Sequence, residues 1–181
     1  MHKMHKNLAV LNLETLTRCE PEQLQTQSVT AVLLALGSNC QAEHYLPRVR
    51  EDLAALGEIQ LSTAFKNPDF TSTEAQPKPD YTNQCVYLSL SESISLQELQ
   101  KIFKGLEGEC HRQRLTEAQT PMKKVTMDID ILLVRTSLDK NSLSNYIPSK
   151  RIISEWLIMA DRYPFKAHEE VGLEELISTK L

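Results

Sequence analysis

The chain has 181 residues, of which 41% are hydrophobic and 24% are charged, and its formal net charge is −4 at pH 7. These values are typical of one globular domain with enough chain to bury a hydrophobic core. The negative balance disfavours a dedicated nucleic-acid-binding protein, which usually carries a basic excess. No apolar run approaches the roughly 18 residues of a membrane span, so no membrane partner is expected.

The cysteines and the N-terminal residues bear on compartment and domain organisation. Four cysteines lie far apart and form no C-x-x-C motif: Cys19, Cys40, Cys85 and Cys110. This spacing argues against a disulfide framework or a zinc site and favours the cytoplasm. The first 20 residues lack the sustained apolar region of a signal peptide. We interpret residues 1–28 as an N-terminal extension, possible as a short helix through Leu8, Leu11, Leu13 and Leu16, and residues 29–181 as the main domain.

The first half of the main domain predicts two strands around a helix. Residues 29–37 are a continuous apolar run that ends at a glycine, which indicates a buried strand. Residues 46–56 have helical apolar spacing, and residues 58–66 are compatible with a second strand. Residues 67–80 contain Pro, Ser and Thr and predict a loop whose length favours a functional role.

The second half predicts a strand, a helix and another strand. Residues 83–90 alternate polar and apolar side chains as a strand does. Ser95 and Glu98 form a capping-box pattern before a helix whose apolar stripe runs to Leu106. Residues 123–134 predict the last strand, and two helices are expected at 152–162 and 173–178.

This order of elements predicts the fold class. The series β-α-β-β-α-β is typical of a ferredoxin-like α+β fold, in which an antiparallel sheet carries its helices on one face, here with additional C-terminal helices. The other face would stay open, with the loops at 67–80 and 111–124 able to fold over it.

Two aspartates stand in the middle of the last predicted strand. Asp128 and Asp130 should point to the same face, with Cα atoms about 6–7 Å apart, because side chains alternate along a strand. The opposite face would hold four apolar residues: Met127, Ile129, Ile131 and Leu133. Two like charges on one face need nearby positive charge. The pattern therefore indicates either a solvated face with Lys and Arg neighbours or a divalent metal site.

A basic segment precedes these aspartates. Its basic side chains, each a potential positive charge, are His111, Arg112, Arg114, Lys123 and Lys124. Both signs of charge together suit a phosphate compound with a divalent cation, although a solvated charged loop has the same composition. Tyr81 and Asn83 open a strand, where they could stack on and hydrogen-bond a flat heterocycle. The chain has no P-loop and no G-x-G-x-x-G motif.

Taken in chain order, these motifs resemble one enzyme family. The motifs are ALGSN at 35–39, PDYTN at 79–83, LE at 106–107, RQR at 112–114 and DIDIL at 128–132. They resemble the 6-hydroxymethyl-7,8-dihydropterin pyrophosphokinases. The resemblance implies a ferredoxin-like enzyme of folate biosynthesis that transfers diphosphate from ATP to the hydroxymethyl group of the pterin, with two Mg²⁺ ions.

The resemblance also implies roles for individual residues. Asp128 and Asp130 would bind the two Mg²⁺ ions, and Arg112 would be the catalytic-loop arginine. The pterin would contact Asn67, Pro68, Tyr81, Asn83 and Trp156, with the rings of Tyr81 and Trp156 on its two faces. ATP would contact Glu107, Arg114, Lys123, Lys124 and Arg151.

Several positions depart from the family pattern. Lysines at 123 and 124 stand where the family has an arginine, and Pro148-Ser149 replaces a Pro-His motif. Lys and Arg are not equivalent at a phosphate group. We therefore keep three hypotheses: an active pyrophosphokinase; a paralogue that binds a pterin or a nucleotide with little or no transfer; and an interaction module whose aspartates are surface charges.

Overall fold

The structure is a computed structural model that describes residues 11–69, 71–114, 124–137 and 156–178. It confirms the predicted α+β class. The strands are β1 (Thr17–Cys19), β2 (Ser28–Ser38), β3 (Gly57–Leu61), β4 (Phe65–Asn67), β5 (Tyr81–Ser95), β6 (Asp128–Thr136) and β7 (Trp156–Met159). The helices are α1 (Ala42–Ala54), α2 (Leu96–Glu109) and α4 (Ala167–Ser178), with short 3-10 turns η3 (Pro21–Gln23) and η4 (Ala160–Arg162).

The sheet has the order β1-β7-β6-β2-β5-β3, and β4 pairs with the other end of β5. The pairs among β6, β2, β5 and β3 are all antiparallel, which is the predicted ferredoxin-like arrangement. The pair of β1 with β7 is parallel. Residues 17–19, which belong to the predicted N-terminal extension, are thus part of the sheet.

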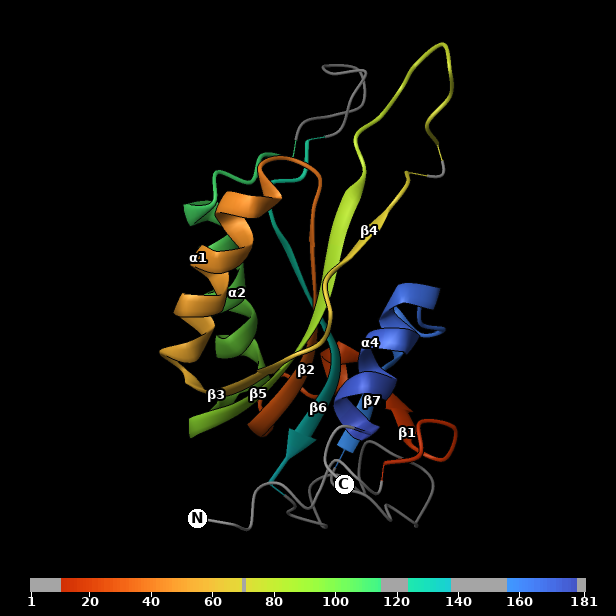
Figure 1. The fold of residues 1–181 in the computed structure, drawn as a ribbon. Helices are drawn as coiled ribbons and strands as arrows, with labels where there is room; N and C mark the ends of the chain where they lie inside the picture. Colours follow the sequence, from red (N-terminus) through yellow and green to blue (C-terminus); the bar gives the residue numbers. More distant parts are fainter. Residues whose placement is uncertain (1–10, 70, 115–123, 138–155, 179–181) are drawn as a thin grey trace.

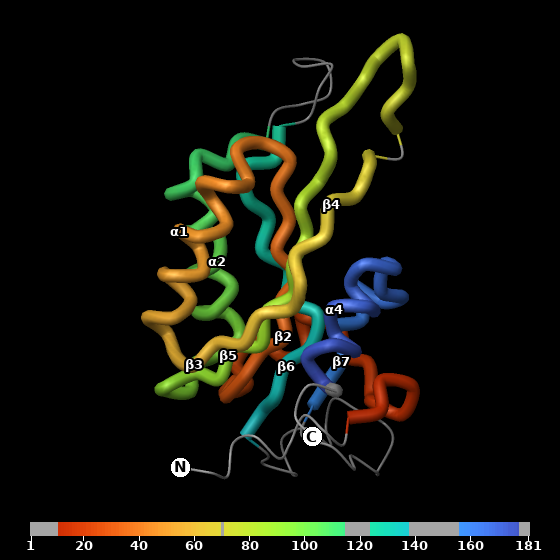
Figure 2. The backbone as a smooth tube through the Cα atoms, viewed as in Figure 1, coloured from red at the N-terminus to blue at the C-terminus, as the bar shows by residue number. Residues whose placement is uncertain are grey.

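Both faces of the sheet are covered, whereas the sequence predicted helices on one face. Figures 1 and 2 show α1 and α2 together on one side and α4 on the other. The α1–α2 side packs residues such as Leu34 and Val86, and the α4 side packs Leu33 and Tyr87. Gly172 lets α4 approach β5, since a Cβ there would lie 2.5 Å from Sγ of Cys85. The continuous apolar run of β2 is explained by burial on both faces.

The predicted helix at 152–162 is wrong. Residues 156–159 form strand β7, and residues 160–162 form a single 3-10 turn, while 152–155 lie outside the described residues. The sequence WLIM is buried on both faces, so its apolar character does not distinguish a strand from a helix. The short helix allowed through Leu8, Leu11, Leu13 and Leu16 does not form over its described residues, where 13–15 are a turn and the three leucines pack on the second core; Leu8 lies outside the described residues.

A β-bulge changes the faces of β6. Leu34 pairs with Ile131 and Leu33 pairs with Leu133, which leaves Leu132 as an extra residue. Ile129 and Ile131 contact the α1–α2 core, but Leu133 joins the α4 core. The prediction that Leu133 shares a face with Ile131 is therefore wrong, since period-two alternation holds only while the register is continuous.

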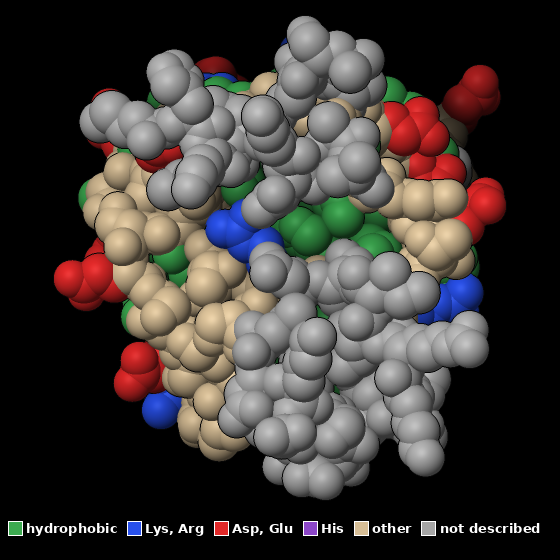
Figure 3. All heavy atoms as spheres, turned by 90° about the horizontal axis from the view of Figure 1, so that it is seen from below, with side chains coloured by type: hydrophobic (Ala, Val, Ile, Leu, Met, Phe, Trp, Pro, Cys, Tyr) green, Lys and Arg blue, Asp and Glu red, His purple; other side chains and the backbone are tan. Residues whose placement is uncertain are grey.

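The surface and the remaining loop complete the fold. Residues 71–80 project beyond the end of the sheet between β4 and β5 rather than lying over it (Figure 1). In the view of Figure 3, acidic side chains are spread around the rim and do not gather in one patch. None of the helices within the described ranges is both long and apolar enough to span a membrane.

Candidate active site

A row of four residues crosses the open end of the α4 face. Asp128 on β6 is opposite Gly37 on β2, which is opposite Asn83 on β5, which is opposite Phe65 on β4. Directly paired residues share a sheet face. A Cβ on Gly37 would lie 3.1 Å from Oδ1 of Asn83, so the glycine leaves room for the asparagine side chain. The side chains of Asp128 and Asn83 thus lie on either side of Gly37, which has no side chain; we call this position the floor of the site.

The second row places the other aspartate on the same face. Asp130 is opposite Ala35, two residues from Gly37, with no register shift between them. Asp128 and Asp130 therefore point the same way, as alternation predicts. At the outer end, Tyr81 is opposite Asn67. The amide nitrogen of Asn67 is buried and has no hydrogen-bond partner among the described residues.

Arg112 is the buried cation of the site. Its Nε donates to Oδ1 of Asp128 at 2.9 Å, and its side chain is only 3% exposed. Nη1 donates to the carbonyl oxygens of Gln113 and Lys124. Nη2 is buried without a hydrogen-bond partner in the part of the chain that the structure describes. The guanidinium thus has one nitrogen, Nη2, with both of its N–H donors unused among the described residues.

Glu107 connects α2 to the strand with the aspartates. Its Oε2 accepts a hydrogen bond from the backbone N–H of Ile129 at 3.0 Å, and its Oε1 lies 3.4 Å from Nη2 of Arg114. Arg114 also lies 3.7 Å from Oδ1 of Asp128. Burial raises the pKa of Glu107, the bond from Ile129 opposes this effect, and the charge of Asp128 adds to it.

Asp130 has a partner that the sequence did not predict. Nη2 of Arg162, which ends η4, lies 2.8 Å from its Oδ1. Burial raises the pKa of Asp130; Arg162 lowers it, and Asp128 raises it further. Arg162 was missed because it lies in the segment predicted as helix, 32 positions after Asp130 by their residue numbers, and no local pattern joins them.

Tyr81 on β5 and Asn39 after β2 connect the strand with Asn83 to the segment that leads into β6. Burial raises the pKa of Tyr81, Asp69 and Asp128 add to this effect, and Arg112 and a side-chain hydrogen bond with Asn39 oppose it. Asn39 also holds the start of the β6 segment, because its N–H donates to the Val125 carbonyl at 2.8 Å and its Oδ1 accepts from the Val125 N–H at 2.6 Å. Asn39 ends the ALGSN motif, but the sequence predicted no role for its side chain.

Other predicted residues are not brought into this cluster. Trp156 is 3% exposed in the α4 core, next to Tyr87, and opposite Arg135 on β6. Because Arg135 pairs with Ala31 whereas Asp128 pairs with Gly37, Trp156 lies about 20 Å along the sheet from the row of Asn83. Pro68 and Lys124 are exposed, and Lys123 and Arg151 lie outside the described residues.

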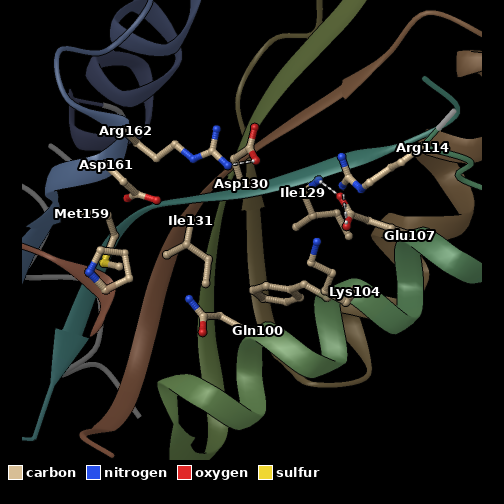
Figure 4. Close-up of a pocket in the computed structure, with 12 residues that line it drawn as sticks. Gln100, Lys104, Glu107, Arg114, Ile129, Asp130, Ile131, Met159, Asp161 and Arg162 are labelled. Carbon is tan, nitrogen blue, oxygen red and sulfur yellow. Dashed lines mark hydrogen bonds and ion pairs between the residues drawn. The ribbon is translucent and has the colours of Figure 1, made fainter. Parts of the chain in front are cut away.

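A pocket of about 330 Å³ lies on the other side of β6. β7 pairs only with Leu133–Arg135, so residues 128–131 have no strand partner on that edge within the described chain. The lining of the pocket comes from η3, α2, β6, β7 and η4. Figure 4 shows Glu107 and Arg114 at one end and Gln100, Ile131 and Met159 at the other. Asp130 and Arg162 line the pocket between these ends, and Asp161 lies beside Met159, so charged side chains occur along its length while Phe103, Ile131 and Met159 supply apolar contacts.

The two aspartates fit a hard divalent cation. Asp128 and Asp130 present carboxylate oxygens on one face, with side chains 28% and 26% exposed, and the mutual repulsion raises the pKa of Asp130 after burial does so. No group of three or more His, Cys, Asp or Glu suited to a metal ion occurs among the described residues. Mg²⁺ commonly uses one or two carboxylates with substrate phosphates and water, so a two-carboxylate set suits it.

A comparison with protein families identifies the family of the chain. Residues 33–160 match the model of the 7,8-dihydro-6-hydroxymethylpterin-pyrophosphokinase family. The match covers more than half of the chain, and the chain therefore belongs to this family, whose members use ATP and Mg²⁺. A search of curated proteins found no matching relative. Residues 11–32, including β1 and η3, precede the matched region.

Proposed function

We propose that this chain transfers the diphosphate group of ATP to the hydroxymethyl oxygen of 6-hydroxymethyl-7,8-dihydropterin, in the cytoplasm, as a step of folate biosynthesis. The observation that carries this proposal is the row of Asp128, Gly37 and Asn83, with the pocket along β6 beside it. The row offers a place for a flat polar ring, and the pocket offers a place for a nucleotide on the other side of the same aspartates.

The pterin would lie on the floor at Gly37. Asn83 carries an amide oxygen and an amide nitrogen that can pair with the amide edge of a pterin. Tyr81 supplies an aromatic ring at the outer end, and the buried amide nitrogen of Asn67 has an unused donor among the described residues. A site of this kind rejects ligands that leave its polar groups unpaired.

The nucleotide would lie along the free edge of β6. On α2, Gln100 and Glu107 are two helical turns apart, about 10 Å, and share one face. Lys104 stands between them, Arg114 stands beside Glu107, and Arg162 reaches Asp130. We therefore assign the phosphates to the end with the aspartates and the base to the end with Gln100.

The transfer itself needs positioning and charge stabilisation. The hydroxymethyl oxygen forms a bond to the β-phosphorus, the bond from that phosphorus to the α–β bridging oxygen breaks, AMP leaves, and the hydroxyl proton is released. Two bound Mg²⁺ ions would neutralise charge on the phosphates. Arg112 would stabilise the charge that develops on them through its unused Nη2 donor, and Asp128 holds its guanidinium in place.

The test is a coupled assay for AMP with ATP, Mg²⁺ and the hydroxymethyl-dihydropterin. We expect AMP release that requires both substrates. The paralogue hypothesis, favoured by the lysines at 123 and 124, instead expects pterin binding by calorimetry and no AMP release. Lys124→Arg is an informative variant, because a planar guanidinium holds two phosphate oxygens and should preserve or raise turnover, whereas Lys124→Ala should lower it.

A further inference from the structure

The segment at residues 17–27 precedes the region matched to the family, yet it is firmly built into the fold. Cys19 and Leu24 are 2% and 0% exposed in the main core. β1 pairs with β7 in parallel, with Cys19 opposite Met159. This segment therefore has a defined position next to the pocket at β6, where Pro21 and Met159 both line the wall.

One end of the segment binds α2. The amide nitrogen of Gln25 donates to the carbonyl of Pro21 at 2.9 Å and to Oε1 of Gln100 at 3.1 Å. The backbone carbonyls of Gln25 and Gln27 accept from the N–H groups of Gln97 and Leu96. These contacts join the segment to the first turns of α2, which supply the pocket wall opposite β7.

The other end of the segment binds the β7 side of the pocket. The guanidinium of Arg18 lies 3.7 Å from the centre of the Tyr163 ring. Tyr163 follows Arg162, the partner of Asp130. The segment thus spans the two walls of the pocket, from α2 to the turn that holds Arg162.

Gln100 is the residue that this arrangement orients. Its amide oxygen is used by Gln25, and its amide nitrogen donates no hydrogen bond to any described residue. It lines the pocket at the end away from Glu107 and Arg114 (Figure 4). A fixed N–H donor in a pocket that also contains the apolar side chains of Pro21, Ile131 and Met159 suits a nitrogen or oxygen acceptor on a purine ring.

We propose that residues 17–27 form a clamp that closes the base end of the nucleotide pocket and holds Gln100 in contact with the base. Gln25 is the positioning residue, and Gln100 is the contact residue. The clamp rests on the nucleotide binding proposed above, and it assigns a role in base recognition to a segment outside the family match.

The test compares two ligands that differ by the base. Wild type, Gln25→Ala and Gln100→Ala are titrated calorimetrically, in Mg²⁺, with an ATP analogue whose α–β bridge is methylene and with tripolyphosphate. We expect both variants to bind the analogue about fivefold more weakly, because each loses a hydrogen bond that fixes or contacts the base. Tripolyphosphate has no base, so its affinity should stay within about twofold. Lys101→Gln, at an exposed position on the same helix that does not line the pocket, is the control and should match wild type for both ligands.

Steady-state kinetics separate positioning from a general structural effect. The KM for ATP should rise in both variants while kcat and the KM for the pterin change little. Unchanged affinity for the analogue in both variants, or an equal loss for analogue and tripolyphosphate, would overturn the clamp. If the wild type binds the analogue but releases no AMP, the proposed transfer is contradicted, and the titrations of the variants still decide the clamp. Wild type that binds no analogue would contradict both.

Discussion

Nε of Arg112 lies 2.9 Å from Oδ1 of Asp128, and the Arg112 side chain is almost fully buried whereas that of Asp128 is partly exposed. The aspartate neutralises a buried guanidinium, and in the function proposed above its partly exposed carboxylate would also bind a cation. A buried charge whose partner is removed is costly, which makes the two aspartates of the strand unequal.

This inequality predicts different effects of Asp128→Asn and Asp130→Asn on stability. Two like charges on one face would by themselves predict that either change relieves repulsion. With Arg112 buried, Asp128→Asn should lower the free energy of unfolding by about 1–3 kcal/mol. Asp130→Asn should cost under about 1 kcal/mol, because Arg162 is 44% exposed and can hydrate. Urea denaturation measures both, and equal losses would contradict the assignment. Both variants should lose Mg²⁺-dependent ATP binding in calorimetry.

The buried carboxyl of Glu107 predicts a pH dependence of stability. Burial raises its pKa above the ordinary value of 4.5. At pH values between the unfolded and the folded pKa, the folded state therefore binds more protons than the unfolded state. Its contribution to the free energy of unfolding must then fall as pH rises from 4.5 through the folded pKa. Glu107→Gln removes this titration. We expect the stability of the variant relative to wild type to increase with pH over that window. A difference that is independent of pH in urea titrations would refute this.

Gly37→Ala should impair the pterin floor. The new methyl group would lie 3.1 Å from Oδ1 of Asn83 and would displace that side chain by a few tenths of an ångström. We expect weaker binding of a pterin analogue and unchanged binding of Mg²⁺-ATP, both by calorimetry. The matched control is Gly105→Ala on α2, where an added Cβ meets nothing within 4 Å. That change should raise the free energy of unfolding by about 0.5–1 kcal/mol and leave ligand binding intact.

The position of Trp156 predicts a stability effect without a ligand effect. Trp156→Phe should lower the melting temperature, since it removes volume from the α4 core, yet leave pterin affinity as in wild type.

Asn83→Ala should weaken pterin binding by roughly 1–3 kcal/mol, at least as much as Tyr81→Ala, because an unpaired polar group costs more than a lost ring contact. A loss of pterin affinity in Trp156→Phe comparable with that in Asn83→Ala would restore Trp156 to the pterin site.

The spacing of neighbouring residues was enough to predict the β-α-β-β-α-β series from β2 to β6. The apolar run of β2, the alternation in β5 and the capping pattern at Ser95 each depend on neighbours within a few residues. The structure shows the cap, since Oγ of Ser95 accepts from the N–H of Glu98 at 3.2 Å. The common face of Asp128 and Asp130 followed for the same reason, because alternation along a strand is a property of the backbone.

The tertiary structure decided the contacts between distant segments. Arg162 reaches Asp130, Glu107 reaches the N–H of Ile129, Gln25 reaches Gln100, and Trp156 enters the second core, although no periodic pattern links these positions. The bulge at Leu132 likewise depends on the register between two strands. The sequence by itself determined the order of the central elements and the motifs that suggested a pyrophosphokinase. Which cation neutralises which carboxylate, and which segments line the pocket, was decided by packing, because a charge that is buried without a partner is costly.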